Sequence, residues 1–110
     1  MSKRKFDVEP SSGNVFADGG LPGADEHLLK AQLVVRLDDI LRRRKLTQNA
    51  AGRLLGIAQP DLSKILRGQF REVSVARLLR FLMALDQDVE IVLKPKRRKA
   101  APSKLTVRAA

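Results

Sequence analysis

The chain of 110 residues has no cysteine and a single histidine. The missing thiols exclude disulfides, thiolate metal sites and cysteine nucleophiles, and a small protein without disulfides suits a reducing compartment. His27 has no cysteine or paired carboxylate at ligand spacing, so we expect a surface residue rather than a metal ligand. No nucleophile and base are arranged as catalysis requires, and we therefore predict neither an enzyme nor a cofactor.

Long apolar runs are also missing. No apolar stretch reaches the ~18 residues of a membrane span, and no short apolar segment follows a basic N-terminal cluster. The first absence argues against a membrane protein and the second against a signal peptide. We expect a cytoplasmic protein with one domain, because a chain of this length rarely supplies two cores.

Positive charge is in excess, since 22 Lys and Arg stand against 12 Asp and Glu, for a formal net charge of +10. Such an excess favours a polyanionic partner, above all nucleic acid. Residues 94–110 hold seven of the basic residues and no acidic one. Because this tail has no aromatic side chain on which bases could stack, we predict a disordered extension that adds only salt-sensitive, non-specific affinity.

Helical periodicity dominates the middle of the chain. Residues 1–23 are rich in Gly, Ser and Pro, which predicts an extended N-terminal arm. From residue 24 apolar side chains recur every three or four positions, and residues 24–93 form the predicted domain. The predicted helices are residues 24–44, Gln48–Leu55 with Thr47 as N-cap, Gln59–Leu66, and residues 75–85 with Ser74 as N-cap.

Each predicted helix has one apolar face, and together these faces define the predicted core. The core residues are Leu29, Leu33, Leu37, Ile40, Leu41, Ala51, Leu54, Leu55, Leu62, Ile65, Leu66, Val75, Leu78, Leu79, Leu82 and Leu85.

Residues 88–93 alternate between polar and apolar side chains, with Val89, Ile91 and Leu93 on one face. This pattern predicts one C-terminal β-strand. A lone strand cannot satisfy its ladder hydrogen bonds, so we expect a partner. The candidates are the short Asn14–Ala17 segment and the same strand of a second subunit.

The first predicted helix ends in four basic residues, 42–45. Cations there stabilise the negative end of the helix dipole, and contact with a phosphate is an equally open interpretation. Asp38 and Asp39 precede Arg42 and Arg43 by four residues, which indicates ion pairs rather than acid–base chemistry.

Residues 46–68 carry two short predicted helices joined by a tight turn. Gly52 allows the helices to approach closely, and Gly56 permits the turn. The outward positions of the second helix carry amide, hydroxyl and cationic groups, which suit a major groove because Gln pairs with adenine edges and Lys with guanine edges. The predicted base-contacting residues are Gln59, Pro60, Ser63, Lys64 and Arg67.

Phosphate contacts are predicted around the same unit. Gln48 stands at the amino end of the first short helix, where a backbone N–H and a side-chain donor can both reach a phosphate. Such contacts position a protein on the duplex without reading its sequence. The predicted phosphate-contacting residues are Thr47, Gln48, Arg53, Arg71 and Ser74.

The unit resembles the helix-turn-helix of the Cro/C1-type, or XRE, regulators. Gly52 departs from the usual Ala of that family, and Ala58 from a capping Ser or Thr. The missing cap should cost ~1 kcal/mol, partly offset by Asp61 in the first turn. The matching residues are Leu46-Thr47-Gln48, Leu55-Gly56, Gln59-Pro60 and Ser63-Lys64.

This resemblance implies a fold class and a partner. The expected fold is all-α and λ-repressor-like, with five helices or fewer, to which the periodicity adds one C-terminal β-strand and flexible termini. The expected protein is a sequence-specific repressor that binds a palindromic operator in double-stranded DNA as a homodimer.

Outside the motif, the segments Asn14–Asp18, Phe70-Arg71 and Asp88–Ile91 are similar to HigA-type antitoxins. That similarity implies repression of the protein's own operon and neutralisation of a ribonuclease toxin. A solitary XRE regulator without a toxin, and a protein whose main task is to mask a toxin, stay open as alternatives. The predicted partner-binding residues are Val15, Phe16, Val89 and Ile91, and for Phe16 packing onto its own domain is the alternative.

Overall fold

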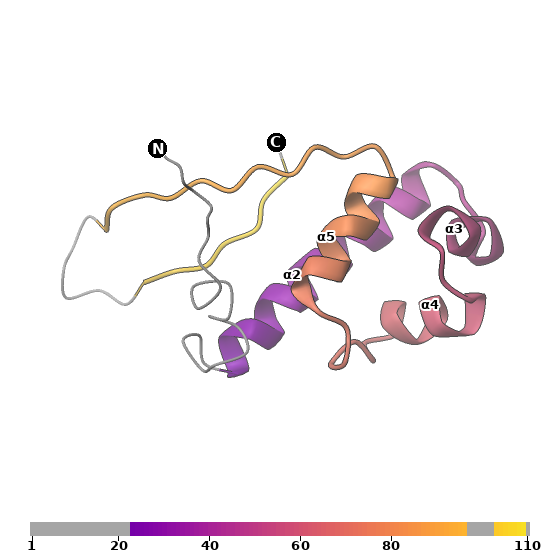
Figure 1. The fold of residues 1–110 in the computed structure, drawn as a ribbon, viewed down its shortest axis with the longest axis horizontal. Coiled ribbons are helices and arrows are strands. Elements are labelled where there is room, and N and C mark those ends of the chain that lie inside the picture. Colours follow the sequence, from indigo (N-terminus) through magenta and orange to yellow (C-terminus); the bar gives the residue numbers. More distant parts are fainter. Residues whose placement is uncertain (1–22, 97–102, 110) are drawn as a thin grey trace.

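The computed structural model describes residues 23–96 and 103–109, and four helices lie within them. The helices begin and end within a residue or so of their predicted bounds. α2 and α5 form a pair that lies on one side of the molecule, while α3 and α4 form its other end (Figure 1). The helices are α2 (Gly23–Arg43), α3 (Gln48–Leu55), α4 (Gln59–Leu66) and α5 (Val75–Ala84).

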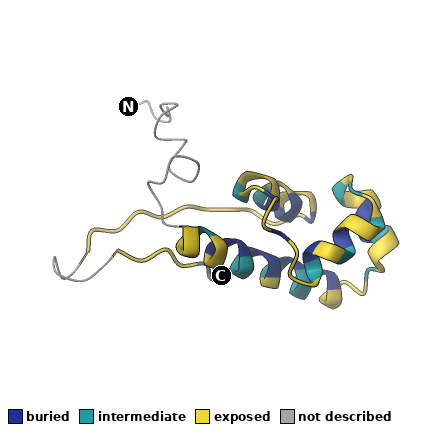
Figure 2. Ribbon diagram, turned by 90° about the horizontal axis from the view of Figure 1, so that it is seen from below, coloured by how far each residue is buried: buried dark blue, intermediate teal, exposed yellow. Residues whose placement is uncertain are grey.

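The predicted C-terminal β-strand is wrong. Residues 87–96 are extended chain, and no strand occurs in residues 23–96 or 103–109. Figure 2 shows the extended segment as exposed along its length. The alternating pattern favours an extended backbone, but a strand also needs a neighbour that accepts and donates its hydrogen bonds. Of the two expected neighbours, Asn14–Ala17 lies outside the described residues.

The core lies where α2 meets α5 and α4. Leu37 of α2 and Leu78 of α5 are each 1 % exposed, and Leu62 of α4 is fully buried. Burial of one such leucine stabilises the fold by roughly 1.5–3 kcal/mol, so these three helices hold one another in place.

One predicted core residue, Leu54, is exposed to 49 %. Its neighbours Ala51 and Gly52 are buried and Leu55 is half-buried. These three residues share one face of α3. Leu54 lies about 100° around the helix axis from the centre of that face, because successive residues are separated by that angle. The close approach of Gly52 turns that face toward α4, and Leu54 is left at the surface.

Helix caps follow the predicted pattern. Thr47 Oγ1 accepts a hydrogen bond from the Ala50 N–H at 3.1 Å, and Ser74 Oγ accepts one from the Arg77 N–H at 3.0 Å. Gly56 ends α3 with a φ of 72°, a left-handed conformation that favours glycine. Ala58, at the N-cap of α4, makes no side-chain capping bond.

The loop between α4 and α5 is tied to the start of α2. Lys30 is buried, and its Nζ donates to the Arg71 carbonyl oxygen at 2.9 Å and lies 3.5 Å from a Glu26 oxygen. The exposed ring of His27 stacks on Phe70, with ring centroids 5.0 Å apart. These contacts fix the position of Arg71 and of the cap that starts α5.

None of the described helices is long and apolar enough to cross a membrane. The same residues contain no group of acidic, histidine or cysteine side chains that could hold a metal ion.

Candidate nucleic-acid interface

The turn between α3 and α4 is built around Gly52. A Cβ atom at this position would lie 2.6 Å from the Ile57 carbonyl oxygen, closer than such atoms approach. The Gly52 carbonyl oxygen accepts hydrogen bonds from the backbone N–H groups of Gly56 and Ile57, the second at 2.9 Å. The predicted close approach is therefore confirmed, and it fixes the angle at which α4 leaves α3.

α4 presents one face to the core and another to solvent. Leu62 and Ile65 are buried on the inner side, and Ile57 partly covers the junction with α3. The structure gathers the five predicted base-contacting residues on the solvent side, where three are exposed and two half-buried. We call this surface the outer face of α4; its residues are Gln59, Pro60, Ser63, Lys64 and Arg67.

The side chains of Gln59 and Gln48 form a hydrogen bond, with Gln59 Nε2 donating to Gln48 Oε1 at 2.7 Å. This bond links α4 to the amino end of α3. It leaves Gln59 with its Oε1 acceptor and a second N–H, the pair of groups that an adenine edge requires. Sequence reasoning assigned the two residues separate roles and missed the bond, because spacing along the chain does not show which side chains meet across a turn.

The bond to Gln59 uses only the side-chain oxygen of Gln48 and leaves its amide N–H groups available, as the predicted phosphate contact requires. Gln48 stands at the first position of α3, where the backbone N–H groups of a helix are unpaired and favour an anion. The Thr47 hydroxyl accepts the Ala50 N–H, and its own proton stays free to donate.

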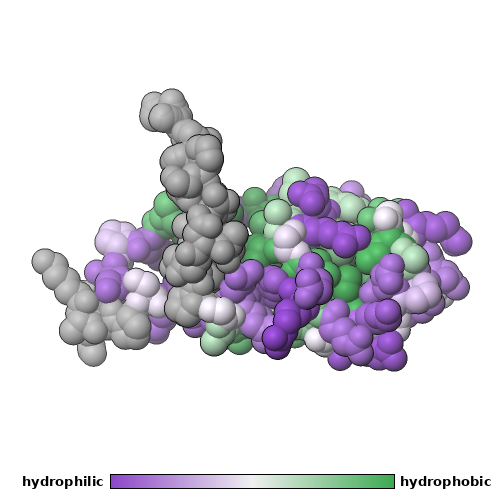
Figure 3. All heavy atoms as spheres, turned by 60° about the horizontal axis from the view of Figure 1, so that its bottom comes forward, coloured by the Kyte–Doolittle hydropathy of each residue, from purple (hydrophilic) through white to green (hydrophobic). Residues whose placement is uncertain are grey.

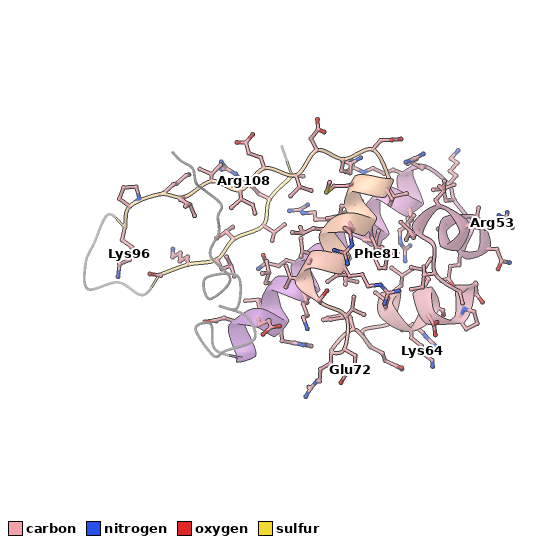
Figure 4. All side chains as sticks on the ribbon, in the orientation of Figure 1. Arg53, Lys64, Glu72, Phe81, Lys96 and Arg108 are labelled. Atoms are coloured by element: carbon pink, nitrogen blue, oxygen red, sulfur yellow. The ribbon has the colours of Figure 1, made fainter. Side chains whose placement is uncertain are left out.

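The other predicted phosphate-contacting residues lie before and after α4 in the chain. Arg53 is exposed on α3, whereas Arg71 is exposed in the loop that Lys30 holds. Ser74 lies at the start of α5 and caps it. Figure 4 shows Arg53 and Lys64 projecting from the α3–α4 end of the molecule.

The basic residues at the end of α2 and just after it make structural contacts. Arg42 Nε lies 2.9 Å from Asp38 Oδ2 and Arg43 Nε lies 3.1 Å from Asp39 Oδ2, which confirms the predicted ion pairs. Arg44 donates to the Leu85 carbonyl oxygen at 3.1 Å and so holds the end of α5. The structural interpretation of this cluster therefore has direct support.

Surface character differs between the two ends of the molecule. Hydrophilic side chains cover much of the end that holds α3 and α4 (Figure 3). The predicted partner-binding residues Val89 and Ile91 lie on the extended C-terminal segment instead, 38 % and 76 % exposed. Val15 and Phe16 lie outside the described residues. The candidate interface thus consists of the outer face of α4 with its neighbours on α3 and α5.

Comparisons with known proteins agree with this geometry. A family profile described as a helix-turn-helix domain matches residues 15–94. A solved structure named as an XRE-family transcriptional regulator is 42 % identical, with a TM-score of 0.77, and the match covers 81 % of this chain and 100 % of that one. No curated protein matches the chain at a significant level.

Proposed function

The chain belongs to the helix-turn-helix family of XRE-type regulators and is a DNA-binding protein, and we propose that it represses transcription by reading a palindromic operator as a homodimer. The observation that carries this proposal is the outer face of α4, where Gln48 holds Gln59 on the same face as Lys64. This surface combines an amide that a hydrogen bond holds in place with a cationic side chain and a hydroxyl group.

Base reading is assigned to this face. Gln59 would accept from the adenine N6 amine and donate to N7, while Lys64 would donate to guanine O6 and N7. Ser63 and Arg67 add adaptable donors, and Pro60 offers an apolar contact to a thymine methyl group. Each good pair discriminates against a wrong base by about 1–3 kcal/mol, so two pairs account for a preference of about thirtyfold or more.

Phosphate contacts set the register of α4 in the groove. Gln48 would hold a phosphate and Gln59 at once, which couples positioning to reading. Thr47, Arg53, Arg71 and Ser74 would contact phosphates on either side. Of these residues, the cationic Arg53 and Arg71 should each steepen the fall of log affinity with log salt by roughly 0.9.

A palindromic operator follows from a dimer. Two copies related by a two-fold axis would place their α4 helices in successive major grooves, about 34–36 Å apart. The two half-sites would then have the same sequence on opposite strands.

The exposed side chains of Val89 and Ile91 favour a second function, the neutralisation of a toxin. Large aliphatic side chains on an extended segment are suited to a protein partner. With Val15 and Phe16 of the N-terminal arm they would contact a ribonuclease toxin encoded beside this gene, which requires that no other partner covers this segment. A solitary regulator would have no such neighbour, so co-purification of the co-expressed neighbouring product distinguishes the two.

The test of base reading is fluorescence anisotropy with two labelled duplexes, the segment directly upstream of the protein's own gene and a random-sequence pool. Gln59→Ala/Lys64→Ala should lose the preference for the upstream duplex by a factor of about 30 or more and keep its affinity for the pool to within a few-fold.

The matched control is Gln69→Ala/Lys104→Ala, which removes the same two side-chain types at exposed positions outside the outer face of α4 and should keep the preference. If wild type itself shows no preference at low and high salt, or if both double variants behave alike, base reading by α4 is wrong.

A further inference from the structure

The segment from Asp88 to Lys96 exposes apolar side chains that the fold does not cover. Ile91 is 76 %, Val92 58 % and Leu93 91 % exposed, the highest value among the large hydrophobic residues described. A soluble monomer rarely leaves so many consecutive aliphatic side chains in water, because burying each would be worth roughly 1.5–3 kcal/mol. The segment therefore has the character of an interface.

The domain holds the chain at Leu85, shortly before this segment, and again at Val107. Leu85, just before it, is fully buried, and Arg44 and Gln87 both donate hydrogen bonds to the Leu85 carbonyl oxygen. Beyond it the chain returns to α2, where the Val107 N–H donates to Gln32 Oε1 at 3.0 Å and Val107 packs against the core. A partner would thus meet a segment whose chain is tethered to the domain on both sides, which lowers the entropy cost of binding.

Charge along the segment changes sign about its centre. Asp88 and Glu90 precede Val92, and Lys94 and Lys96 follow it at the same spacings. A sequence of this kind is complementary to a second copy of itself in antiparallel orientation, where each acidic position meets a basic one. In parallel orientation like charges would meet, which is unfavourable.

Resting on the homodimer of the proposed function, we propose that residues 88–96 are the surface through which two copies of this chain associate. The two segments lie side by side and antiparallel about a two-fold axis near Val92, so that Ile91 lies beside Leu93 of the partner subunit on one face of the pair and the charged side chains meet on the opposite face. Glu90 faces Lys94 of the partner subunit, and by symmetry the reverse pair forms as well. One substitution therefore changes two pairs in every dimer.

The exposed apolar area of this segment supports a second copy of the chain as the partner. The aliphatic side chains from Val89 to Leu93 expose several hundred Å² together, comparable with the largest patch of a typical monomer. Stable dimers bury about 800 Å² per partner, of which these aliphatic side chains would supply a substantial part. The segment leaves α5 and extends away from α3 and α4 (Figure 1), so association here leaves the outer face of α4 free in both copies.

Charge reversal tests this pairing on the full chain. Glu90→Lys places cations at both 90 and 94, and Lys94→Glu places anions at both. Light scattering coupled to size exclusion, with sedimentation equilibrium, should show a dimer for wild type. For each variant alone we expect a dimer dissociation constant raised at least tenfold.

Mixing the two variants should restore association as a heterodimer, because each cation then faces an anion across the axis. The double variant Glu90→Lys/Lys94→Glu should dimerise like wild type. Helical circular dichroism and melting temperature establish that each variant is folded. A structural defect within one chain could not be repaired by mixing two defective chains.

Three results would each overturn the proposal. They are a wild type that stays monomeric, single variants that dimerise as well as wild type, and a mixture that does not associate. A monomeric wild type that binds a different protein through this segment would point to the toxin as its occupant.

Failure of this inference and failure of the proposed function give different results. Gln59→Ala/Lys64→Ala should dimerise like wild type whatever its effect on DNA. If the charge variants dimerise normally while wild type still prefers its upstream duplex, only the location of the interface is wrong. If wild type dimerises through this segment without any DNA preference, only the reading of DNA is wrong.

Discussion

The α3–α4 unit and the segment 88–96 are both rich in aliphatic side chains, yet the first buries them and the second exposes them. Leu62 of α4 is fully buried, whereas Leu93 is 91 % exposed. A helix completes its backbone hydrogen bonds within itself and needs only one covered face. An extended segment must obtain both its hydrogen bonds and its cover from a neighbour. In this chain the helical pattern therefore predicts structure by itself, whereas the alternating pattern of residues 88–93 predicts a strand only where a neighbouring segment is present to pair with it.

A pair of matched leucine substitutions should show the largest difference between these regions. Leu78→Ala, at a site 1 % exposed, should lower the free energy of unfolding by ~3 kcal/mol because it leaves a cavity. Leu93→Ala should change it by less than ~0.5 kcal/mol in the monomer. Urea denaturation at concentrations low enough to keep the chain monomeric measures both. Similar losses for the two variants would mean that Leu93 packs against its own domain.

The next largest effect is expected at the turn. Gly52→Ala should destabilise the fold by about 2 kcal/mol, because its Cβ meets the Ile57 carbonyl oxygen at 2.6 Å and the α3–α4 angle must open. Gly23→Ala is the control, since a Cβ there meets nothing within 4 Å. A stabilised Gly52→Ala variant would show that helix propensity outweighs the clash.

A gain of stability is expected where the family's usual cap is missing. Ala58→Ser should add ~1 kcal/mol, because the backbone already has the extended conformation of an N-cap, with φ −66° and ψ 144°. Its counterpart is Thr47→Ala, which should lose ~1 kcal/mol at the start of α3. Differential scanning calorimetry should show opposite shifts of roughly 4–8 °C. An unchanged melting temperature for Ala58→Ser would mean that the serine does not cap.

The smallest effect is expected for Arg43→Ala at the end of α2. Its pair with Asp39 is exposed, with side chains 78 % and 45 % accessible, so the loss should be a few tenths of a kcal/mol. The alternative interpretation, that this basic cluster contacts a phosphate, is tested by the salt dependence of DNA binding. A slope unchanged from wild type supports a structural role, and a slope reduced by about 1 would mean a phosphate contact.

Much of the fold could be predicted because its determinants are local. The caps Thr47 and Ser74, the left-handed Gly56 and the uncapped Ala58 each depend on residues within one turn of themselves. The ion pairs of Arg42 and Arg43 were equally predictable, since helical spacing alone brings such partners together.

Other features depend on how the helices pack and could not be predicted. The Gln48–Gln59 bond joins residues 11 positions apart across a turn, and the Lys30 bond to the Arg71 carbonyl oxygen spans 41. Leu54 has the apolar character of a core residue, and only the orientation of α3 leaves it exposed. These contacts and this exposure depend on how the helices are placed relative to one another, which the spacing of apolar residues does not show.

The sequence by itself determined the helices, their caps, the tight turn at Gly52 and the polar composition of the outer face of α4, because short-range sterics and hydrogen bonds decide each of these. The tertiary structure decided which polar groups meet and which apolar groups stay uncovered. It held Gln59 on Gln48, buried Lys30 beneath the α4–α5 loop and left Ile91 and Leu93 in solvent. The physical reason is that side chains distant in sequence share an environment only after the helices have packed.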